Sequence, residues 1–262
     1  METRHFDVIV VGGGHAGCEA AVAAARMGAK TGLLTLNKNM IAQMSCNPSV
    51  GGSAKGHLVR EIDALGGVMG QVADRTGIQF RLLNRSRGPA VRAPRVQCDK
   101  ELYRMEMQKL LAEQANLTVE ETEVATILRQ KDRLVAIETV DGRRIDCSAL
   151  VLTTGTFLNG LCHVGEHKFM AGRSGEKASV SMAESIRDLN LEVGRLKTGT
   201  PPRLERSSID FSGFEVQPGD TTPTFFSFGS HEVQLEQVCC WVAHTNTEVH
   251  QVIRDNLHRS PL

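Results

Sequence analysis

One cysteine in a tight, glycine-flanked loop is the residue of this sequence best suited to covalent chemistry. Cys46 precedes Asn47 and Pro48, and Gly51 and Gly52 follow shortly after. Proline forces the residue before it toward an extended conformation, and the paired glycines let the backbone approach a ligand closely. We expect a helix directly after the loop, whose N-terminal amides and positive dipole end point back at the thiol. Such surroundings are typical of a nucleophilic cysteine, so Cys46 is the candidate catalytic residue.

A glycine-rich turn near the N-terminus predicts a dinucleotide-binding site. The apolar run over residues 6–11 resembles a buried strand, and an alanine-rich stretch over residues 18–27 is typical of a closely packed helix. Between them stands the pattern G-x-G-x-x-G. Its first glycine makes the turn, its second leaves room for a pyrophosphate, and its third lets helix and strand pack together. The candidate cofactor-binding residues of this loop are Gly12, Gly13, Gly14, His15, Ala16 and Gly17.

The acidic residue that usually binds the ribose is missing from this pattern. It is expected about 20 residues after the glycines, at the end of the second strand. The second strand is predicted over residues 31–36, and Asn37 follows it. Asn37 or a backbone group would then make the ribose contact. We interpret His15 as a loop residue near the cofactor rather than as a proton shuttle.

Composition restricts the class of protein. The chain has 262 residues, of which 41% are hydrophobic, enough for one large domain or for one domain and part of another. Its net charge is zero, so a nucleic-acid site would have to be a local basic patch. The stretch 81–95 has five arginines and no acid, and fits either phosphate binding or a solvated face. Seven scattered cysteines without C-x-x-C pairs favour reduced thiols in a cytoplasmic protein. We predict no metal site, no signal peptide and no membrane-spanning segment.

Several long and chemically unusual motifs occur along the chain. They cover residues 12–21, 46–49, 77–84, 88–92, 155–158, 195–203, 245–246 and 256–261. Together they resemble the FAD-dependent subunit of the tRNA uridine 5-carboxymethylaminomethyl modification enzymes, the MnmG/GidA family. The resemblance extends over essentially the whole chain.

The resemblance implies a specific activity. Members bind FAD, take reducing equivalents from NADH and use methylenetetrahydrofolate as a one-carbon donor. They build a carboxymethylaminomethyl or aminomethyl group on carbon 5 of the wobble uridine of tRNA. They form a homodimer that joins a GTPase subunit in a heterotetramer. By motif match, Val124 and Ser179 contact FAD, residues 197–203 line the flavin cleft, and Cys46 is the functionally essential cysteine.

The expected fold is α/β: a Rossmann-like FAD-binding domain with a β-meander, plus part of an inserted second domain. Asp99 is a candidate helix cap. Strands are predicted over residues 134–140 and 143–147 around an Asp-Gly turn, and an apolar strand over 149–154 follows. Beyond Pro201 the composition shifts toward Pro, Ser and Thr. We therefore predict an FAD-binding domain over residues 1–200 and an incomplete second domain over residues 201–262.

Three other interpretations stay open. The first is the related folate- and FAD-dependent tRNA uridine methyltransferase, and the second is a flavin oxidoreductase that acts on a small acid. Family members are far longer and carry a second cysteine loop, part of the NADH site and a tRNA- and partner-binding region beyond residue 262. The third interpretation is therefore a fragment, a non-catalytic FAD-binding and dimer-forming module. We expect this chain alone to be inactive.

Overall fold

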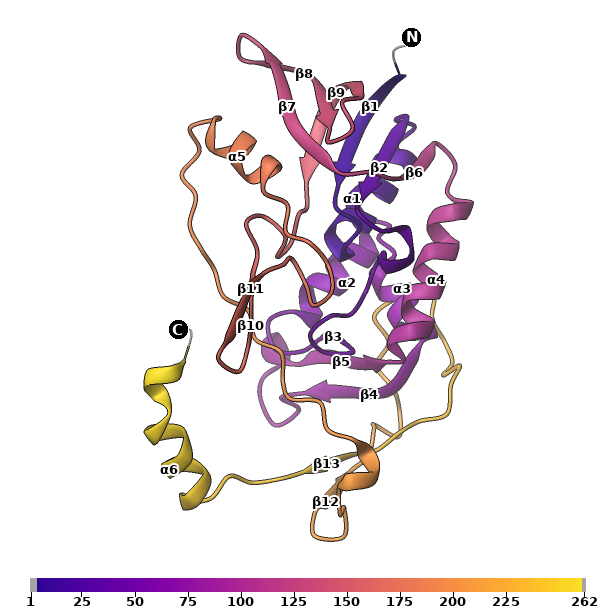
Figure 1. Ribbon diagram of the computed structural model, residues 1–262. Helices are drawn as coiled ribbons and strands as arrows, with labels where there is room; N and C mark the ends of the chain where they lie inside the picture. The colour runs from indigo at the N-terminus through magenta and orange to yellow at the C-terminus, as the bar shows by residue number, and fades with distance from the viewer. Residues whose placement is uncertain (1–3, 261–262) are drawn as a thin grey trace.

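The largest sheet within residues 4–260 has six strands, in the order β6-β2-β1-β9-β8-β7. The computed structural model describes residues 4–260 (Figure 1). The strands of this sheet are β1 (Arg4–Val11), β2 (Thr31–Thr35), β6 (Leu117–Glu121), β7 (Val124–Gln130), β8 (Arg133–Thr139) and β9 (Arg144–Leu152). The first three and β9 are parallel, whereas β7 and β8 form an antiparallel meander beside β9. The predicted α/β Rossmann-like fold with a β-meander is confirmed.

The two strands predicted over residues 143–154 are one strand in the structure. β9 pairs with β1 over almost its whole length and with β8 over its first residues. The apolar pattern is interrupted at Ser148 because that residue is exposed. An exposed position in a strand does not break the hydrogen-bond ladder, so the prediction of a break was wrong.

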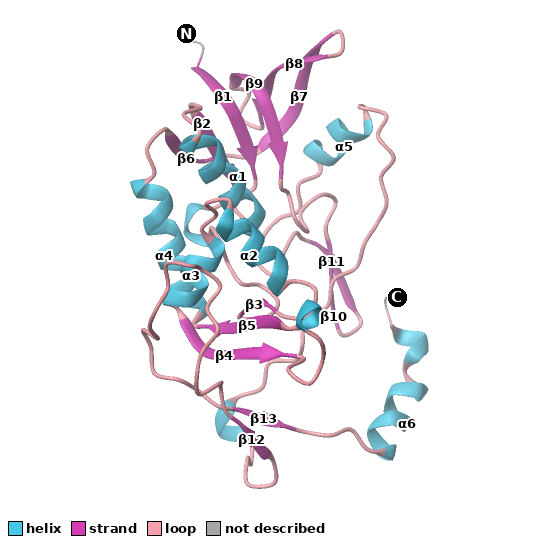
Figure 2. Ribbon diagram, turned by 180° about the vertical axis from the view of Figure 1, so that it is seen from behind, coloured by secondary structure: helices cyan, strands magenta, loops and turns pink. Residues whose placement is uncertain are grey.

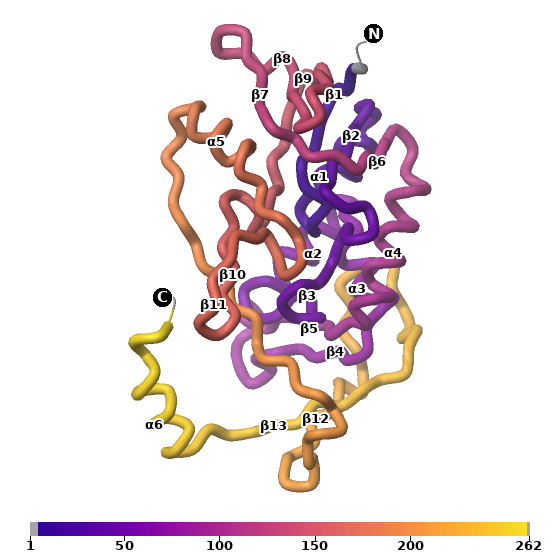
Figure 3. The backbone as a smooth tube through the Cα atoms, in the orientation of Figure 1, coloured from indigo at the N-terminus to yellow at the C-terminus, as the bar shows by residue number. Residues whose placement is uncertain are grey.

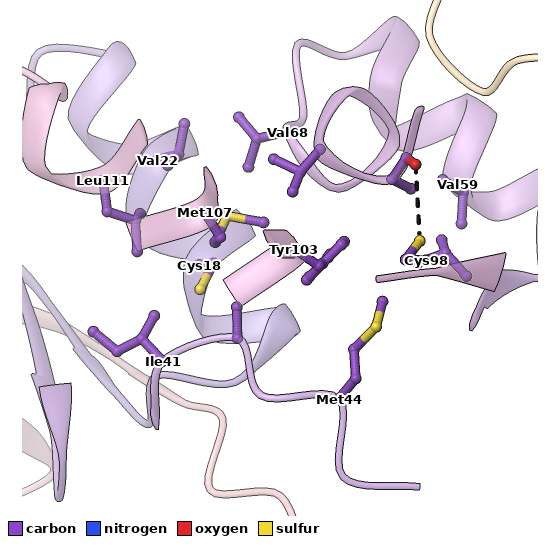
Figure 4. Packing of buried hydrophobic residues seen from close by; sticks show 14 of the residues in the cluster. Cys18, Val22, Ile41, Met44, Val59, Val68, Cys98, Tyr103, Met107 and Leu111 are labelled. Carbon is purple, nitrogen blue, oxygen red and sulfur yellow. Dashed lines mark hydrogen bonds between the residues drawn. The ribbon is translucent and has the colours of Figure 1, made fainter. Parts of the chain in front are cut away.

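Both faces of the sheet are covered, as in other parallel sheets. In β1, Val8 and Val10 pack into one hydrophobic cluster, and Ile9 and Val11 pack into the other. The first cluster includes side chains from α1 (His15–Arg26) and α4 (Lys100–Glu113), and the second includes one from α5 (Ser181–Arg187). Figure 4 shows Cys18, Tyr103 and Met107 of the first cluster lying against one another. Asp99 caps α4 as predicted, because its carboxylate accepts hydrogen bonds from Glu101 N and Leu102 N.

A second, antiparallel sheet follows the cysteine loop. It consists of β3 (Ser49–Gly51), β5 (Ala93–Cys98) and β4 (Gly77–Leu83), and α2 (Gly56–Ala64) and α3 (Met69–Arg75) pack beside it. The helix predicted after the loop is α2, which begins at Gly56, and that prediction is confirmed. The loop itself contains a strand that was not predicted, because Val50 pairs with Val96 and is buried. Gly51 and Gly52 then turn the chain with φ values of +80° and +98°.

The last sixty residues contain little regular structure. Their elements are β12 (Glu215–Gln217), β13 (Cys240–Val242) and α6 (Thr247–Asp255). Figures 1 and 3 show the chain passing along β4, where Asp220 N donates to Phe80 O (2.8 Å) and Val238 N donates to Ile78 O (2.7 Å). Phe226 is fully buried in the first hydrophobic cluster. The division into domains at residue 200 stays a prediction. The remaining short elements are β10 (Leu161–Val164), β11 (His167–Met170), η1 (Lys38–Met40), η2 (Pro89–Val91), η3 (Arg206–Ser208) and η4 (Leu257–Arg259).

A buried carboxylate fastens the segment around Phe226 to α3. The two oxygens of Asp74 accept hydrogen bonds from Phe226 N (3.0 Å) and Ser227 N (2.8 Å). Burial raises the pKa of Asp74, and these two amides act in the opposite direction. Asp74→Ala leaves two buried amides without an acceptor, so we expect it to lower the free energy of unfolding by about 3 kcal/mol. Urea denaturation measures this change. Asp210→Ala, which removes a carboxylate from an exposed turn, is the control and should leave the urea midpoint unchanged.

Candidate functional site

The glycine-rich turn lies where the parallel strands β1 and β9 end side by side. Gly12 follows β1 with a φ of +109°, and a Cβ there would lie 2.4 Å from Thr153 O. The Thr153 hydroxyl lies within hydrogen-bond distance of two backbone oxygens to which it can donate, Val11 O (2.9 Å) and Gly12 O (3.0 Å). Ligands of open α/β sheets bind at such carboxyl ends, where the strand order reverses. β1 and β9 flank that reversal, because the order runs from β1 to β2 and β6 on one side and to β9 on the other.

The second and third glycines of the pattern differ in what surrounds them. A Cβ on Gly17 would lie 1.8 Å from Gly12 O, so the first turn of α1 packs directly against the loop. A Cβ on Gly14 would meet nothing within 4 Å, and Gly14 is exposed with an ordinary extended backbone. Sterics inside the protein therefore explain Gly17 but not Gly14. The open space at Gly14, at the start of a helix, is the candidate phosphate cradle.

The start of α1 is not capped by a side chain. Gly14 is the N-cap without a side-chain cap, and no acidic residue stands in the first turn. Exposed amides and the positive end of the helix dipole favour an anion at this place. His15 packs beside the Tyr103 ring, with 5.4 Å between the ring centroids, and burial lowers its pKa. His15 thus packs against α4 beside the glycine-rich turn, and its contact with a cofactor stays a prediction.

Asn37, predicted as a possible ribose contact, caps the next turn of the chain. Its side-chain oxygen accepts a hydrogen bond from Asn39 N (2.9 Å) at the start of η1. The neighbouring Lys38 N donates to the Glu121 carboxylate (2.9 Å). The oxygen of Asn37 is thus already engaged, and its ribose contact stays a prediction.

The cysteine loop is held by two distant segments of the chain. The Cys46 thiol donates to Gly199 O (2.8 Å), and the Arg203 guanidinium donates to Cys46 O (3.0 Å) and Ser45 O (3.2 Å). Arg173 donates to the Ser45 hydroxyl (2.9 Å) and pairs with Glu176 in its own turn. Three parts of the sequence therefore meet around Cys46. Residues 197–203 were predicted to line the flavin cleft. Arg173 was not predicted as a site residue, because no local pattern links it to Ser45.

The structure brings some of the predicted site residues together and separates others. Ala42 N donates to Gly13 O (2.8 Å), which joins the start of the cysteine loop to the glycine-rich turn. Ser179 exchanges backbone hydrogen bonds with Phe157 and Asn159, on the segment that leads from β9 toward Arg173. Val124 is buried in the second hydrophobic cluster at the start of β7. Within residues 4–260, no hydrogen bond joins Val124 to the glycine-rich turn or to Cys46. The FAD contacts of Val124 and Ser179 stay predictions.

The thiols fall into buried and accessible groups. Cys18, Cys98 and Cys147 are buried, and burial raises their pKa values to about 12, 12 and 11. Cys46 is only half-buried, at the surface of its loop. Cys18, Cys98 and Cys147 are therefore packing residues.

Alkylation of the native chain should follow this division. With a pKa near 12, about one thiol in 10,000 is a thiolate at pH 8, so we expect iodoacetamide to leave Cys18 and Cys98 unmodified. Cys46 should be labelled in the same sample, as read by peptide mass spectrometry. Urea-unfolded protein is the control, in which all seven cysteines should react. Equal labelling rates of Cys18 and Cys46 in the native chain would contradict the assignment.

The arginines of residues 81–95 serve partly as structural anchors. Arg85 pairs with Asp220 (2.6 Å), and Arg81 donates to Pro218 O (3.1 Å). Both contacts hold the later segment against β4. Asp220 lies far from Arg85 in the sequence. The local sequence therefore showed no acidic partner for the positive charge of these arginines. Phosphate binding stays a prediction for the exposed Arg87 and Arg92.

Residues 4–260 contain neither a candidate metal centre nor a candidate membrane-spanning helix. No group of three or more His, Cys, Asp and Glu side chains in this range is placed to hold a metal ion. No helix in the same range has the length and apolar character needed to cross a membrane.

Comparison with known proteins assigns the family. The family model described as "Glucose inhibited division protein A" matches residues 7–262. The tRNA uridine 5-carboxymethylaminomethyl modification enzyme MnmG of Geobacter metallireducens is 52% identical over 259 residues, which cover 99% of this chain and 42% of that protein. The MnmG of Protochlamydia amoebophila is 52% identical over 257 residues, which cover 98% of this chain and 41% of that protein. The chain thus spans less than half the length of the curated relatives it matches.

Solved structures agree with this assignment. Aquifex aeolicus GidA in the form I crystal superposes with a TM-score of 0.93 at 48% identity, over 98% of this chain and 44% of that chain. The GidA-related protein of Thermus thermophilus has a TM-score of 0.52 at 20% identity, over 70% of this chain and 68% of that chain, and shows a shared fold only. The predicted resemblance is confirmed: the chain belongs to the glucose inhibited division protein A family.

Proposed function

We propose that this chain is the FAD-binding part of an enzyme that modifies the wobble uridine of tRNA at carbon 5. The observation that carries the proposal is the direct connection between the two loops. Ala42 N donates a hydrogen bond to Gly13 O. The segment that leads to Cys46, the candidate nucleophile, is therefore attached to the glycine-rich turn, the candidate phosphate cradle. The names of the curated relatives supply the substrate, a tRNA uridine, and the product class.

In this proposal, the glycine-rich turn binds the pyrophosphate of FAD. Gly12, Gly13, Gly14, His15, Ala16 and Gly17 form the cradle, in which exposed amides at the start of α1 meet the negative charge. Val124 would contact the adenine side and Ser179 a further part of the cofactor. When bound, FAD supplies redox chemistry, with NADH as the source of the reducing equivalents. The fit of the cradle supports a dinucleotide, and the family resemblance identifies it as FAD.

Cys46 is proposed as the nucleophile that prepares the uracil ring. Its thiolate would add to carbon 6, which raises the electron density at the adjacent carbon 5, where the new bond forms. The same cysteine would leave again once the proton on carbon 5 is removed. In the structure its thiol donates to Gly199 O, so a base must take that proton before attack. Arg203, Arg173 and Gly199 would orient the loop, because each contacts it directly.

The further partners follow from the family resemblance. Methylenetetrahydrofolate would supply the carbon unit, and a GTPase subunit would join a homodimer of this protein in a heterotetramer in the cytoplasm. The relatives are more than twice as long as this chain, so much of the NADH, tRNA and partner contacts would lie in their additional length. We therefore expect the chain alone to bind FAD without turning over.

Product analysis tests the proposal. A chimera in which this chain replaces the matching part of the Geobacter metallireducens relative should restore a carboxymethylaminomethyl or aminomethyl group on wobble uridine in cells that lack their own enzyme. Mass spectrometry of tRNA nucleosides identifies the group. A methyl group would favour the related tRNA uridine methyltransferase instead. An unmodified uridine, from a chimera that still binds FAD, would favour the non-catalytic FAD-binding module.

A further inference from the structure

A surface hollow lies between the β10–β11 hairpin and the C-terminal turn η4. Figures 1 and 2 show the chain after α6 returning toward this hairpin. The contact between them is an ion pair of Arg259 with Glu166 (3.0 Å). The hollow encloses about 260 Å³, which is room for a phosphate group and part of the molecule that carries it.

Basic side chains dominate the wall of this hollow. His163 and Lys168 stand directly opposite each other in the β10–β11 ladder, so their side chains project from the same face. His258 and Arg259 contribute from η4, and Glu166 is the one acid among the lining residues. Within residues 4–260, no ion pair engages Lys168, His163 or His258. Basic groups at opposed ladder positions repel one another when charged, and a bound anion would remove that repulsion.

Arg259 is held in position before any ligand arrives. Its guanidinium donates to the Asn256 side chain (2.8 Å) as well as pairing with Glu166. A fixed guanidinium fork, an ammonium and two imidazoles make a donor set that matches the oxygens of a phosphate. All of these side chains are exposed. The site therefore suits one phosphate of a longer polymer that also contacts the protein at other places.

We propose that this hollow binds a phosphate group, and that the phosphate is a backbone phosphodiester of the tRNA substrate. The proposal rests on the proposed function for the identity of the RNA. The simpler alternative is that the Arg259–Glu166 pair only clamps the hairpin to the C-terminal turn. The two ideas predict different effects of replacing Glu166 by an uncharged residue. If the pair is only a clamp, the hairpin is held less firmly to the C-terminal turn. If the hollow is an anion site, the affinity for an anion rises because a repelling carboxylate is removed.

Binding of a tRNA transcript to the full chain, followed by fluorescence anisotropy over a series of salt concentrations, separates the two. We expect Lys168→Gln to weaken binding about fivefold and to reduce the slope of log K against log salt by about 0.7 to 0.9, the value of one phosphate contact. We expect Glu166→Gln to tighten binding about threefold. Lys109→Gln, which removes an exposed positive charge on α4 on the other side of the molecule, is the control and should leave the slope unchanged. Thermal unfolding of each variant verifies that the fold is kept.

Competition with inorganic phosphate distinguishes the sources of the anion. If the site takes RNA phosphodiesters, inorganic phosphate should lower tRNA affinity no more than chloride of equal ionic strength does. If inorganic phosphate instead displaces the RNA and protects the wild-type chain against unfolding, but not Lys168→Gln, the ligand is a free phosphate and the RNA assignment is wrong. Weaker binding by Glu166→Gln, or an unchanged slope for Lys168→Gln, would overturn the site while leaving the proposed function standing. A chain that binds FAD but no tRNA would overturn the site but not the proposed function, because much of the tRNA contacts is expected in the additional length of the relatives.

Discussion

Gly14→Val is expected to weaken FAD binding about 100-fold, about 2.7 kcal/mol, while the fold stays intact. The added side chain meets no protein atom within 4 Å of its Cβ, and the backbone at Gly14 is extended, so any residue can adopt it. The free energy of unfolding should therefore fall by no more than about 1 kcal/mol, which is the cost of a less favourable N-cap residue. The side chain would instead fill the space that the pyrophosphate needs at the start of α1. Equilibrium titration with FAD, together with urea denaturation, measures both quantities.

Two glycine variants serve as comparisons for this result. Gly213→Val is the matched control, because its Cβ also meets nothing within 4 Å but lies far from the loop in sequence, and FAD affinity should not change. Gly17→Ala should fail differently, because its Cβ would lie 1.8 Å from Gly12 O and must displace α1 from the loop. Normal FAD affinity in Gly14→Val would show that the cofactor does not occupy the cradle.

Cys46→Ser is expected to lower formation of the modified uridine at least about 1,000-fold without loss of FAD. Serine has nearly the same shape, and its hydroxyl can donate to Gly199 O as the thiol does. The loop contacts from Arg203 reach backbone oxygens and are retained. The neutral hydroxyl is a far weaker nucleophile than a thiolate, so only the addition to the ring should fail. The assay is nucleoside mass spectrometry on tRNA treated with the chimera described above.

Cys162→Ser provides the matched control for this experiment. Cys162 is also half-buried, and its thiol donates to a backbone oxygen, Ala171 O (3.6 Å). Its replacement should leave product formation within about twofold of the unsubstituted chimera. Full activity of Cys46→Ser would assign that cysteine to packing of the loop and would remove the nucleophile from the proposed mechanism.

Local patterns in the sequence were sufficient to predict the nucleotide-binding half of the fold. The turn between β1 and α1 depends on residues close in sequence. The role expected of each glycine in the pattern follows from the geometry of that turn alone. The cap of α4 at Asp99 and the hairpin of β8 and β9 around its Asp-Gly turn are equally local. The fold class could therefore be predicted before any tertiary contact was known.

Features that depend on distant partners could not be predicted in this way. The strand β3 exists because Val50 pairs with Val96, and no local pattern indicated a strand between Cys46 and the helix α2. Arg173 reaches Ser45 across more than a hundred residues, and Asp74 anchors Phe226 from an even greater separation. The periodicity of hydrophobic residues carries no information on such pairs. The candidate site was thus predicted by its cysteine and glycines, but not by the residues that hold them in place.

The visible absorption spectrum of the purified chain, after incubation with FAD and removal of unbound cofactor, tests the central claim most directly. We predict a flavin band at about one FAD per chain, which persists when NADH is added without oxygen because the chain lacks more than half the length of its relatives. Rapid bleaching by NADH would show that this chain already contains a working reductant site. Absence of any flavin band would contradict the assignment of the cradle at Gly14 as an FAD site.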